Sequence, residues 1–219
     1  MVLALAAPPI ALWVIPVADL GGVARHVGDV VRAGLPGYRL VILCPPGPLA
    51  EVLTAAGAAV IARPFGPAAG LRNSVRTLTH TVSTLRPDVV HSHLAYADIV
   101  TALVPMPGGT IRVTTEHGIA RGDRVYHDTT ARSRLMEAAH AARLRRFDVA
   151  IAVSAATRAA MIDKWHGPEG IVVIPNGVDR GDQGSRRPGL RILSVSRLSA
   201  EKRLPDLVEA FAHLRRVRR

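Results

Sequence analysis

The sequence has few of the residues that build disulfide-stabilised, cysteine-metal or membrane-spanning proteins. Cys44 is the only cysteine among 219 residues. This excludes an internal disulfide and most cysteine-built metal sites, and its place at the end of an apolar run predicts a small buried side chain. The apolar stretch 2–18 has no basic segment before it and is broken by Pro8, Pro9 and Pro16, unlike a signal peptide or a membrane span. We therefore expect a cytoplasmic protein.

Lysine is also scarce, and the positive charge is unevenly distributed. Only Lys164 and Lys202 are lysines among the 28 basic residues, and the formal net charge is +11. Residues 1–179 carry 17 basic and 13 acidic residues, a net of +4, whereas residues 180–219 carry 11 and 4, a net of +7. Phosphate-binding positions and a solvated arginine tail would both account for the second value. No nucleic-acid partner is expected.

Short apolar runs alternate with longer amphipathic ones over the first 179 residues, a pattern typical of a parallel sheet covered on both faces. The pattern predicts strands over 10–15, 39–44, 59–62, 89–91, 111–115, 149–153 and 171–174. It predicts helices over 23–33, 49–56, 71–85, 95–103, 129–145 and 155–165, with Gly34 ending the first. The fold class is therefore α/β, with one doubly wound, Rossmann-like parallel sheet in residues 1–179.

A polar, glycine-rich segment then separates this domain from a short apolar ending. Residues 180–189 lack apolar periodicity and are interpreted as a linker. Residues 190–195 resemble a strand and residues 205–214 an amphipathic helix, so 190–219 are expected to be the incomplete start of a second Rossmann-like domain. The helix would leave an apolar face uncovered within this chain.

The loop after the first predicted strand opens a helix with Gly21 and Gly22. Glycines at a helix N-terminus allow a phosphate or a polar sugar to approach bare backbone N–H groups. The pair could equally permit a tight turn, and it lacks the spacing of a dinucleotide site. Nearby, Asp19 could touch a ligand or cap the helix, and His26 could touch a ligand or lie on the helix surface.

Histidines gather at the ends of two further predicted strands. His91 and His93 would point to the same side if their strand continued, but no third metal ligand lies nearby in sequence. His117 lies beside Gly118 and could donate a hydrogen bond to a substrate hydroxyl group. Glu116 could orient a group, pair with a basic neighbour, or remain a solvated carboxylate.

Two cations follow the predicted strand at 190–195. Arg197 and Lys202 would lie at the carboxyl end of that strand, beside a helix N-terminus. A guanidinium and an ammonium group there suit a diphosphate, because they neutralise charge that builds on a leaving phosphate.

In this order the motifs resemble the GT4 family of glycosyltransferases, a retaining class with the two-domain GT-B architecture. The similarity extends over most of the chain. It rests on Gly21-Gly22 with His26-Val27, on 87–93, on Glu116-His117-Gly118, on Val153-Ser154, on 174–179, and on Ser196-Arg197 with Glu201-Lys202.

The resemblance implies transfer of a sugar from a nucleotide-sugar donor to a glycan or lipid acceptor with retained anomeric configuration. It implies that Gly21 and Gly22 lie against the donor diphosphate or the acceptor, that His117 contacts the donor sugar, and that Arg197 and Lys202 hold the diphosphate. The acceptor-side positions that it implies are His26, His93, Glu116 and Asn176. No cofactor or metal is expected to be required for the chemistry.

The sequence departs from the family pattern. The pair of glutamates, separated by seven residues, that supports the donor sugar and ribose in the family is expected to belong to sequence that is absent here, together with most of the nucleotide pocket. We therefore expect little or no transferase activity from this chain alone. One alternative is a non-catalytic, acceptor-binding half that needs a complementing chain.

A second alternative is a peripheral protein on an acidic membrane at the cytoplasmic face. A basic and apolar surface would suit such attachment. Its candidate residues are Arg121, Arg124, Arg132, Arg134, Arg143, Arg145 and Arg146 with Leu135, Met136 and Leu144.

Overall fold

The computed structural model describes residues 7–118, 130–178, 191–196 and 202–217. The chain divides into two compact units, Met1–Asp179 and Arg180–Arg219. No helix among the described residues has both the length and the apolar character needed to cross a membrane.

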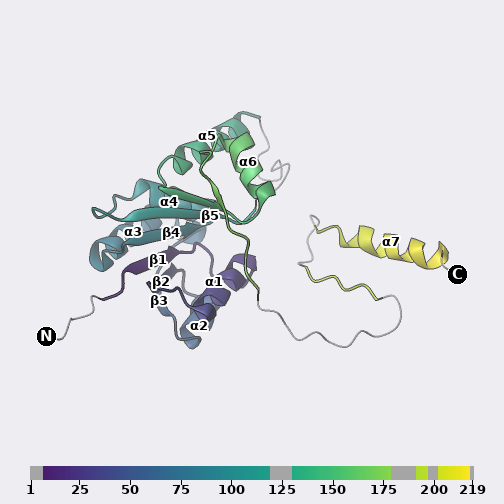
Figure 1. The fold of residues 1–219 in the computed structure, drawn as a ribbon, viewed down its shortest axis with the longest axis horizontal. Helices are drawn as coiled ribbons and strands as arrows, with labels where there is room; N and C mark the ends of the chain where they lie inside the picture. Colours follow the sequence, from purple (N-terminus) through teal and green to yellow (C-terminus); the bar gives the residue numbers. More distant parts are fainter. Residues whose placement is uncertain (1–6, 119–129, 179–190, 197–201, 218–219) are drawn as a thin grey trace. The chain divides into compact units, whose positions relative to one another are not determined.

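The first unit is built on a parallel sheet of seven strands (Figure 1). They are β1 (Ile10–Val14), β2 (Arg39–Cys44), β3 (Ala59–Ala62), β4 (Val89–His93), β5 (Ile111–Glu116), β6 (Val149–Ala152) and β7 (Val172–Val173). Their spatial order is β3-β2-β1-β4-β5-β6-β7, and every neighbouring pair is parallel. This is the doubly wound, Rossmann-like arrangement that the alternation of apolar and amphipathic runs predicts.

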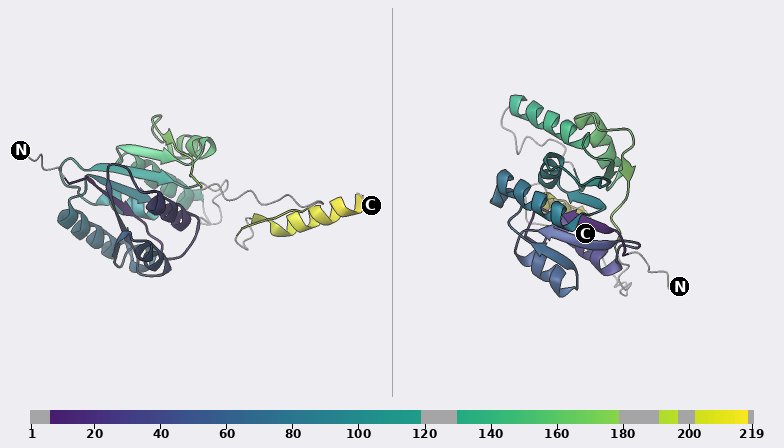
Figure 2. Two further views of the ribbon diagram at one scale, coloured as in Figure 1. Left: turned by 60° about the horizontal axis from the view of Figure 1, so that its bottom comes forward. Right: turned by 90° about the vertical axis from the view of Figure 1, so that its left-hand side faces the viewer.

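Helices connect the strands and lie on both sides of the sheet (Figures 1 and 2). They are α1 (Gly22–Ala33), α2 (Pro48–Ala55), α3 (Leu71–Leu85), α4 (Ala95–Leu103), α5 (Thr130–Leu144) and α6 (Ala155–Trp165), with a short 3-10 turn, η1 (Pro67–Ala69), before α3. Because successive strand residues face opposite sides, β1 contributes to two cores. Trp13 packs with α1 and α2, whereas Leu12 packs with α3 and α4.

The predicted elements of the first unit agree with the structure to within two residues at each end. The helices predicted over 71–85, 95–103 and 155–165 have these bounds in the structure. Gly34 ends α1 with a φ of 78°, a left-handed conformation that glycine adopts at little cost. Ser154 caps α6, because its hydroxyl oxygen accepts a hydrogen bond from the Thr157 N–H at 3.0 Å.

The predicted strand over 190–195 is wrong for the residues that the structure describes, since 191–196 form no strand. A strand needs a neighbour to satisfy its backbone N–H and C=O groups, and the described residues of this unit provide none. The predicted helix is present as α7 (Leu204–Val217). Asp206 lies in its first turn and Arg215 in its last, which favours both helix ends electrostatically.

The carboxyl ends of β1, β4 and β5 form the edge of the sheet where a ligand is expected. The chain runs from β1 outward to β2 and β3 and then returns to place β4 on the other side of β1. In open α/β sheets, ligands bind outside the carboxyl ends at such a reversal of strand order. Gly66 brings another loop to this edge, where an added Cβ would lie only 2.3 Å from the Pro16 carbonyl oxygen.

Candidate functional site

Four histidines from three segments of the chain meet at this edge of the sheet. His91 and His93 lie on β4, His26 on α1 and His117 just after β5. The strand β4 continues to His93, so His91 and His93 do face the same side, with ring centroids 4.3 Å apart. The fold supplies the neighbours that local sequence could not, because β5 lies beside β4 and α1 follows β1.

The imidazoles are in direct contact. His93 Nδ1 lies 2.9 Å from His117 Nε2, at hydrogen-bond distance. The ring of His26 lies 5.2 Å from that of His117 and 5.8 Å from that of His93, centroid to centroid. One ring nitrogen from each of these three side chains lies within 4.8 Å of the others. His93 is fully buried, whereas His26 and His117 are partly exposed.

Burial keeps these imidazoles uncharged at neutral pH. The pKa of His91 falls to about 3, chiefly through burial and then through the nearby His26 and His117. The pKa of His117 falls to about 4 for the same first reason, with a contribution from His26. Burial also lowers the pKa of His93 well below its ordinary value and lowers that of His26, where Asp29 partly opposes it. Neutral imidazoles can both donate and accept hydrogen bonds.

Trp13 packs against three of the four histidine rings. Its indole ring stacks on His26 at 5.8 Å and contacts His93 at 4.5 Å and His91 at 5.0 Å, between ring centroids. His91 Nε2 lies 2.7 Å from the hydroxyl oxygen of Thr115 on β5. Each ring is therefore held by packing or a hydrogen bond, which fixes the orientation that a binding site requires.

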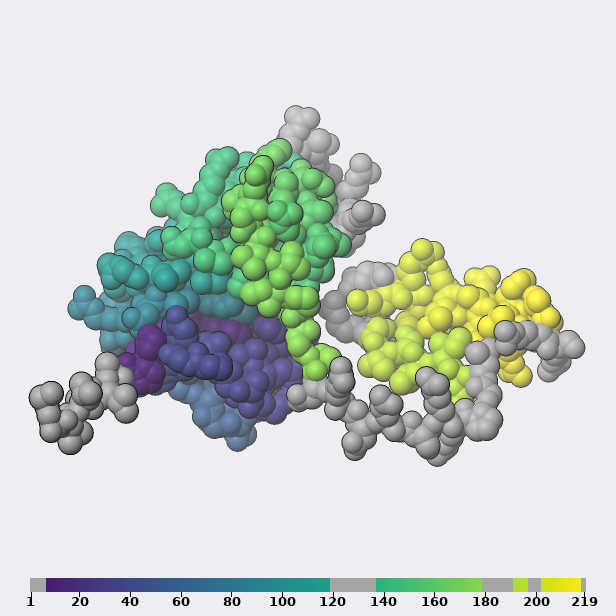
Figure 3. Space-filling view, in the orientation of Figure 1, coloured from purple at the N-terminus to yellow at the C-terminus, as the bar shows by residue number. Residues whose placement is uncertain are grey.

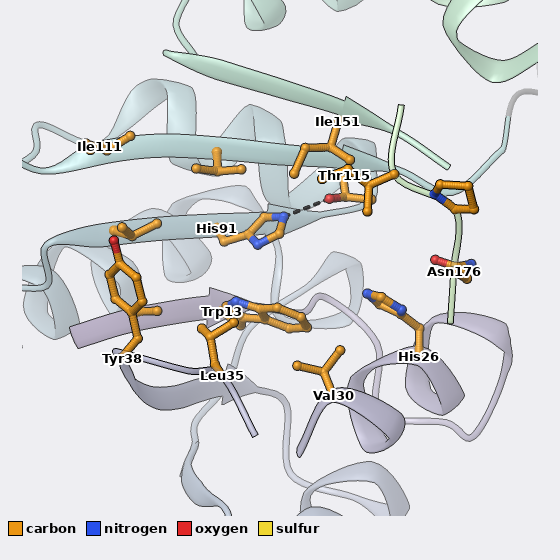
Figure 4. A pocket seen from close by; sticks show the side chains of 15 residues that line it. Trp13, His26, Val30, Leu35, Tyr38, His91, Ile111, Thr115, Ile151 and Asn176 are labelled. Carbon is orange, nitrogen blue, oxygen red and sulfur yellow. Dashed lines mark hydrogen bonds between the residues drawn. The ribbon is translucent and has the colours of Figure 1, made fainter. Parts of the chain in front are cut away.

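An apolar groove of about 470 Å³ leads along the sheet to this cluster (Figure 4). His26 and Asn176 lie at one end, Trp13 and His91 form part of its floor, and Tyr38 lies at the other end. The exposed segment after β7 forms one border of the groove. In the space-filling view this green segment extends to the dark purple-blue residues of α1 (Figure 3). Gly177 and Val178 line a second pocket together with His26.

The backbone conformation at the start of α1 does not require glycine at positions 21 and 22. Gly21 has φ −147°, which any residue adopts, and Gly22 is the first residue of the helix. A Cβ added at either position would meet nothing within 4 Å. The interpretation of the pair as a tight turn is thus not supported, and open space lies in front of the helix N-terminus. Asp19 does not cap this helix, since the N-cap residue is Gly21 and no side chain caps it.

Glu116 lies in a buried ion pair. Its carboxylate accepts a hydrogen bond from Arg143 Nη2 at 2.9 Å, and Arg143 also pairs with Asp98. Asp98 in turn accepts hydrogen bonds from Ser92 at 2.5 Å and Thr114 at 2.8 Å. Glu116 is therefore not a solvated carboxylate, and the predicted pairing of Glu116 with a basic residue is confirmed. This network joins the ends of β4 and β5 to α4 and α5, so it holds the strand ends that carry His93 and His117.

The remaining predicted site residues are spread over the chain. Asn176 is exposed and lines the groove. Lys202 belongs to the second unit and is exposed, while Arg197 lies outside the described residues. Two residues predicted for the membrane-binding surface do not lie on a surface, because Arg143 and Leu144 are buried inside the first unit.

Four residues outside the predicted set also shape the site, namely Trp13, Thr115, Asp98 and Arg143. Trp13 carried a usable signal, since it is one of two tryptophans and lies near the end of a strand. The partners Asp98 and Arg143 are 45 residues apart in sequence and were placed on predicted helices, where an acidic or basic residue is most often solvated.

Several solved structures have the same fold. A glycosyltransferase from Rickettsia africae has 20% sequence identity and a TM-score of 0.58, covering 78% of this chain and 44% of that one. Anabaena Alr3699/HepE in complex with UDP-glucose has 20% identity and a TM-score of 0.61, with the same coverage. A UDP-N-acetylglucosamine 2-epimerase has 14% identity and a TM-score of 0.56, covering 78% and 49%.

These similarities establish the fold, and the chain spans less than half the length of these solved proteins. No curated protein sequence matches the chain. A family match provides the assignment that structural similarity alone does not. Residues 20–182, which include the glycine pair and all four clustered histidines, match the Glycosyltransferase Family 4 domain, and the chain therefore belongs to this family.

Proposed function

We propose that this chain forms the acceptor-side part of a retaining glycosyltransferase, which moves a sugar from a nucleoside-diphosphate sugar to a hydroxyl group of a glycan or lipid. One observation carries the proposal. Three partly or fully buried imidazoles, His26, His93 and His117, meet at the carboxyl edge of the sheet next to the open N-terminus of α1.

His117 is proposed to bind the donor sugar. Its lowered pKa leaves it neutral at pH 7, so it suits an uncharged hydroxyl group rather than a phosphate. The contact with His93 orients the ring. The N–H groups at the start of α1, with Gly21 and Gly22 leaving room, would bind an anionic or strongly polar group.

A nucleotide-sugar donor is also consistent with the solved proteins of the same fold. Anabaena Alr3699/HepE was solved with UDP-glucose and with UDP and glucose. That similarity covers 44–45% of the Anabaena chain. The use of a nucleotide-sugar donor by the present protein is therefore a proposal.

The proposed reaction breaks the bond between the anomeric carbon and the terminal phosphate oxygen. The acceptor oxygen forms its bond to that carbon on the same face, and the departing phosphate takes the proton of the acceptor hydroxyl. Arg197 and Lys202 would stabilise the charge that develops on the diphosphate, so the chemistry requires no metal. Positively charged side chains then take the place that a divalent cation has in other phosphate-transfer sites.

The acceptor is proposed to enter through the apolar groove. His26 and Asn176 lie at the end of the groove that adjoins the histidine cluster. An acceptor with an apolar portion could therefore lie along the sheet while its hydroxyl group reaches the donor sugar. This groove also favours the second candidate, an acceptor-binding half that needs a complementing chain for catalysis.

Calorimetric titration with UDP, GDP and ADP, and with their glucose conjugates, tests the proposal. We expect one of these ligands to bind, and a Gly21→Val, Gly22→Val double variant to bind it at least about tenfold more weakly because the side chains fill the space before α1. An Arg197→Ala, Lys202→Ala variant tests the diphosphate contacts. A folded chain that binds none of them would contradict a donor site here and leave the acceptor-binding half as the function.

A further inference from the structure

We propose that a cleft between β3 and α3 binds the phosphate group of a small ester through Arg63 and Arg76. The cleft has a volume of about 610 Å³ and is lined by β3 and the turn after it on one side and by α3 on the other. Cavities of this size hold small organic ligands. The cleft shares no lining residue with the apolar groove and contains none of the four clustered histidines, so the inference does not depend on the proposed function.

The segment that forms this cleft accounts for the whole net charge of the first unit. Residues 1–179 have a net charge of +4, and residues 52–87 contain four arginines and no aspartate or glutamate. The rest of the unit has equal numbers of basic and acidic residues. None of the four guanidinium groups forms an ion pair with a carboxylate among the residues that the structure describes. The positive charge of this segment is therefore not neutralised within the described chain, which favours an anionic ligand.

Two of these arginines line the cleft, one from each wall. Arg63 follows β3 and Arg76 lies on α3, and both are exposed. The two walls are joined by Thr77, whose hydroxyl group donates a hydrogen bond to the carbonyl oxygen of Pro64 at 2.9 Å. This bond holds the turn that carries Arg63 against the helix that carries Arg76. A guanidinium group can donate two parallel hydrogen bonds to the oxygens of a phosphate, so the two walls suit such a group between them.

The placement of charge along α3 also favours a bound anion. Arg72 and Arg76 are four residues apart on this helix, and like charges at that spacing lie on the same face and destabilise a helix. The helix has no acidic residue that would offset the repulsion. An anion bound at Arg76 would reduce this repulsion.

The other residues of the cleft favour an ester over inorganic phosphate. Ile61 and Leu85 are partly buried and provide apolar surface for the group that the phosphate carries. Thr84 is exposed in the same cleft, and its hydroxyl group makes no hydrogen bond within the described part of the chain. It is therefore available to donate to a phosphate oxygen. A soluble phosphate ester and the headgroup of an anionic lipid both have this chemistry.

Phosphorus NMR titration with butyl phosphate tests the inference, with inorganic phosphate as the comparison. We expect butyl phosphate to bind more tightly than inorganic phosphate. Arg63→Gln and Arg76→Gln should each weaken its binding at least about tenfold, because each removes a charged hydrogen-bond donor. Both side chains are exposed, and circular dichroism would verify that each variant folds.

Arg39→Gln is the matched control, because it removes the same charge from an exposed position on β2 that does not line the cleft. It should bind butyl phosphate like the parent chain. Sedimentation with phosphatidylcholine vesicles, with and without phosphatidic acid, distinguishes the two sources of the phosphate. Binding to the phosphatidic acid vesicles alone would assign the site to a lipid headgroup, provided that Arg63→Gln and Arg76→Gln lose it and Arg39→Gln does not. Equal binding by the parent, Arg63→Gln and Arg76→Gln chains, or no binding in either assay, would overturn the inference.

Discussion

The buried histidines make the stability of the first unit sensitive to mild acid, and His91 allows the size of the effect to be worked out. Its pKa is about 3 in the folded protein, compared with about 6.5 in the unfolded chain. The folded pKa is the lower one, so the unfolded state binds more protons between these values. The stabilisation is therefore complete above about pH 6.5 and is lost as the pH falls.

The expected loss follows from about 1.4 kcal/mol for each pH unit and proton. Between pH 7 and about pH 5, protonation of His91 in the unfolded chain alone should lower the free energy of unfolding by about 2 kcal/mol. His93 acts in the same direction, because its pKa is also well below the ordinary value. Carboxylates titrate mostly below this window, since their ordinary pKa values are about 4.

Urea unfolding at several pH values measures this loss. His91→Gln removes the titrating group and retains a side chain able to bond to Thr115, so its free energy of unfolding should fall about 2 kcal/mol less than that of the parent chain over the window. His80→Gln, at an exposed position, should leave the pH dependence unchanged. An identical pH dependence in the parent and His91→Gln chains would show that His91 does not cause the loss.

Three further substitutions test the site and its support. Arg143→Ala should cost about 3–5 kcal/mol in urea unfolding, because Asp98 and Glu116 would remain buried without their shared cation; a loss below about 1 kcal/mol would contradict this. Gly22→Ala should leave the melting temperature nearly unchanged but weaken donor binding in calorimetry, whereas unchanged binding would argue against a ligand there. Leu78→Ala should cost about 2–5 kcal/mol in the same unfolding assay, against a negligible loss for a surface position.

The sheet could be predicted from sequence because each strand is marked locally. The apolar runs at 39–44 and 59–62 are short and bounded by turn residues, and both strands have these limits in the structure. The strand at 190–195 could not be judged in the same way. Its apolar run is similar, but a strand forms only where a neighbour accepts and donates backbone hydrogen bonds.

The site could be predicted only in part, because its chemistry depends on contacts between distant segments. His93 and His117 each end a strand, and their proximity follows once β4 and β5 are known to be neighbours. The approach of His26 depends on how α1 packs against Trp13, which no local pattern specifies. For the same reason the sequence offered no third partner to His91 and His93, whereas the fold brings His26 and His117 beside them.

We propose that the histidine cluster binds the sugar of a nucleotide-sugar donor. Saturation-transfer NMR of UDP-glucose with this chain tests it most directly, because this method detects weak binding and shows which ligand protons touch the protein. We expect transfer to the glucose ring protons in the parent chain and its loss in His117→Ala, with His80→Ala unaffected. Equal transfer to the glucose protons in the parent and His117→Ala chains would contradict the claim.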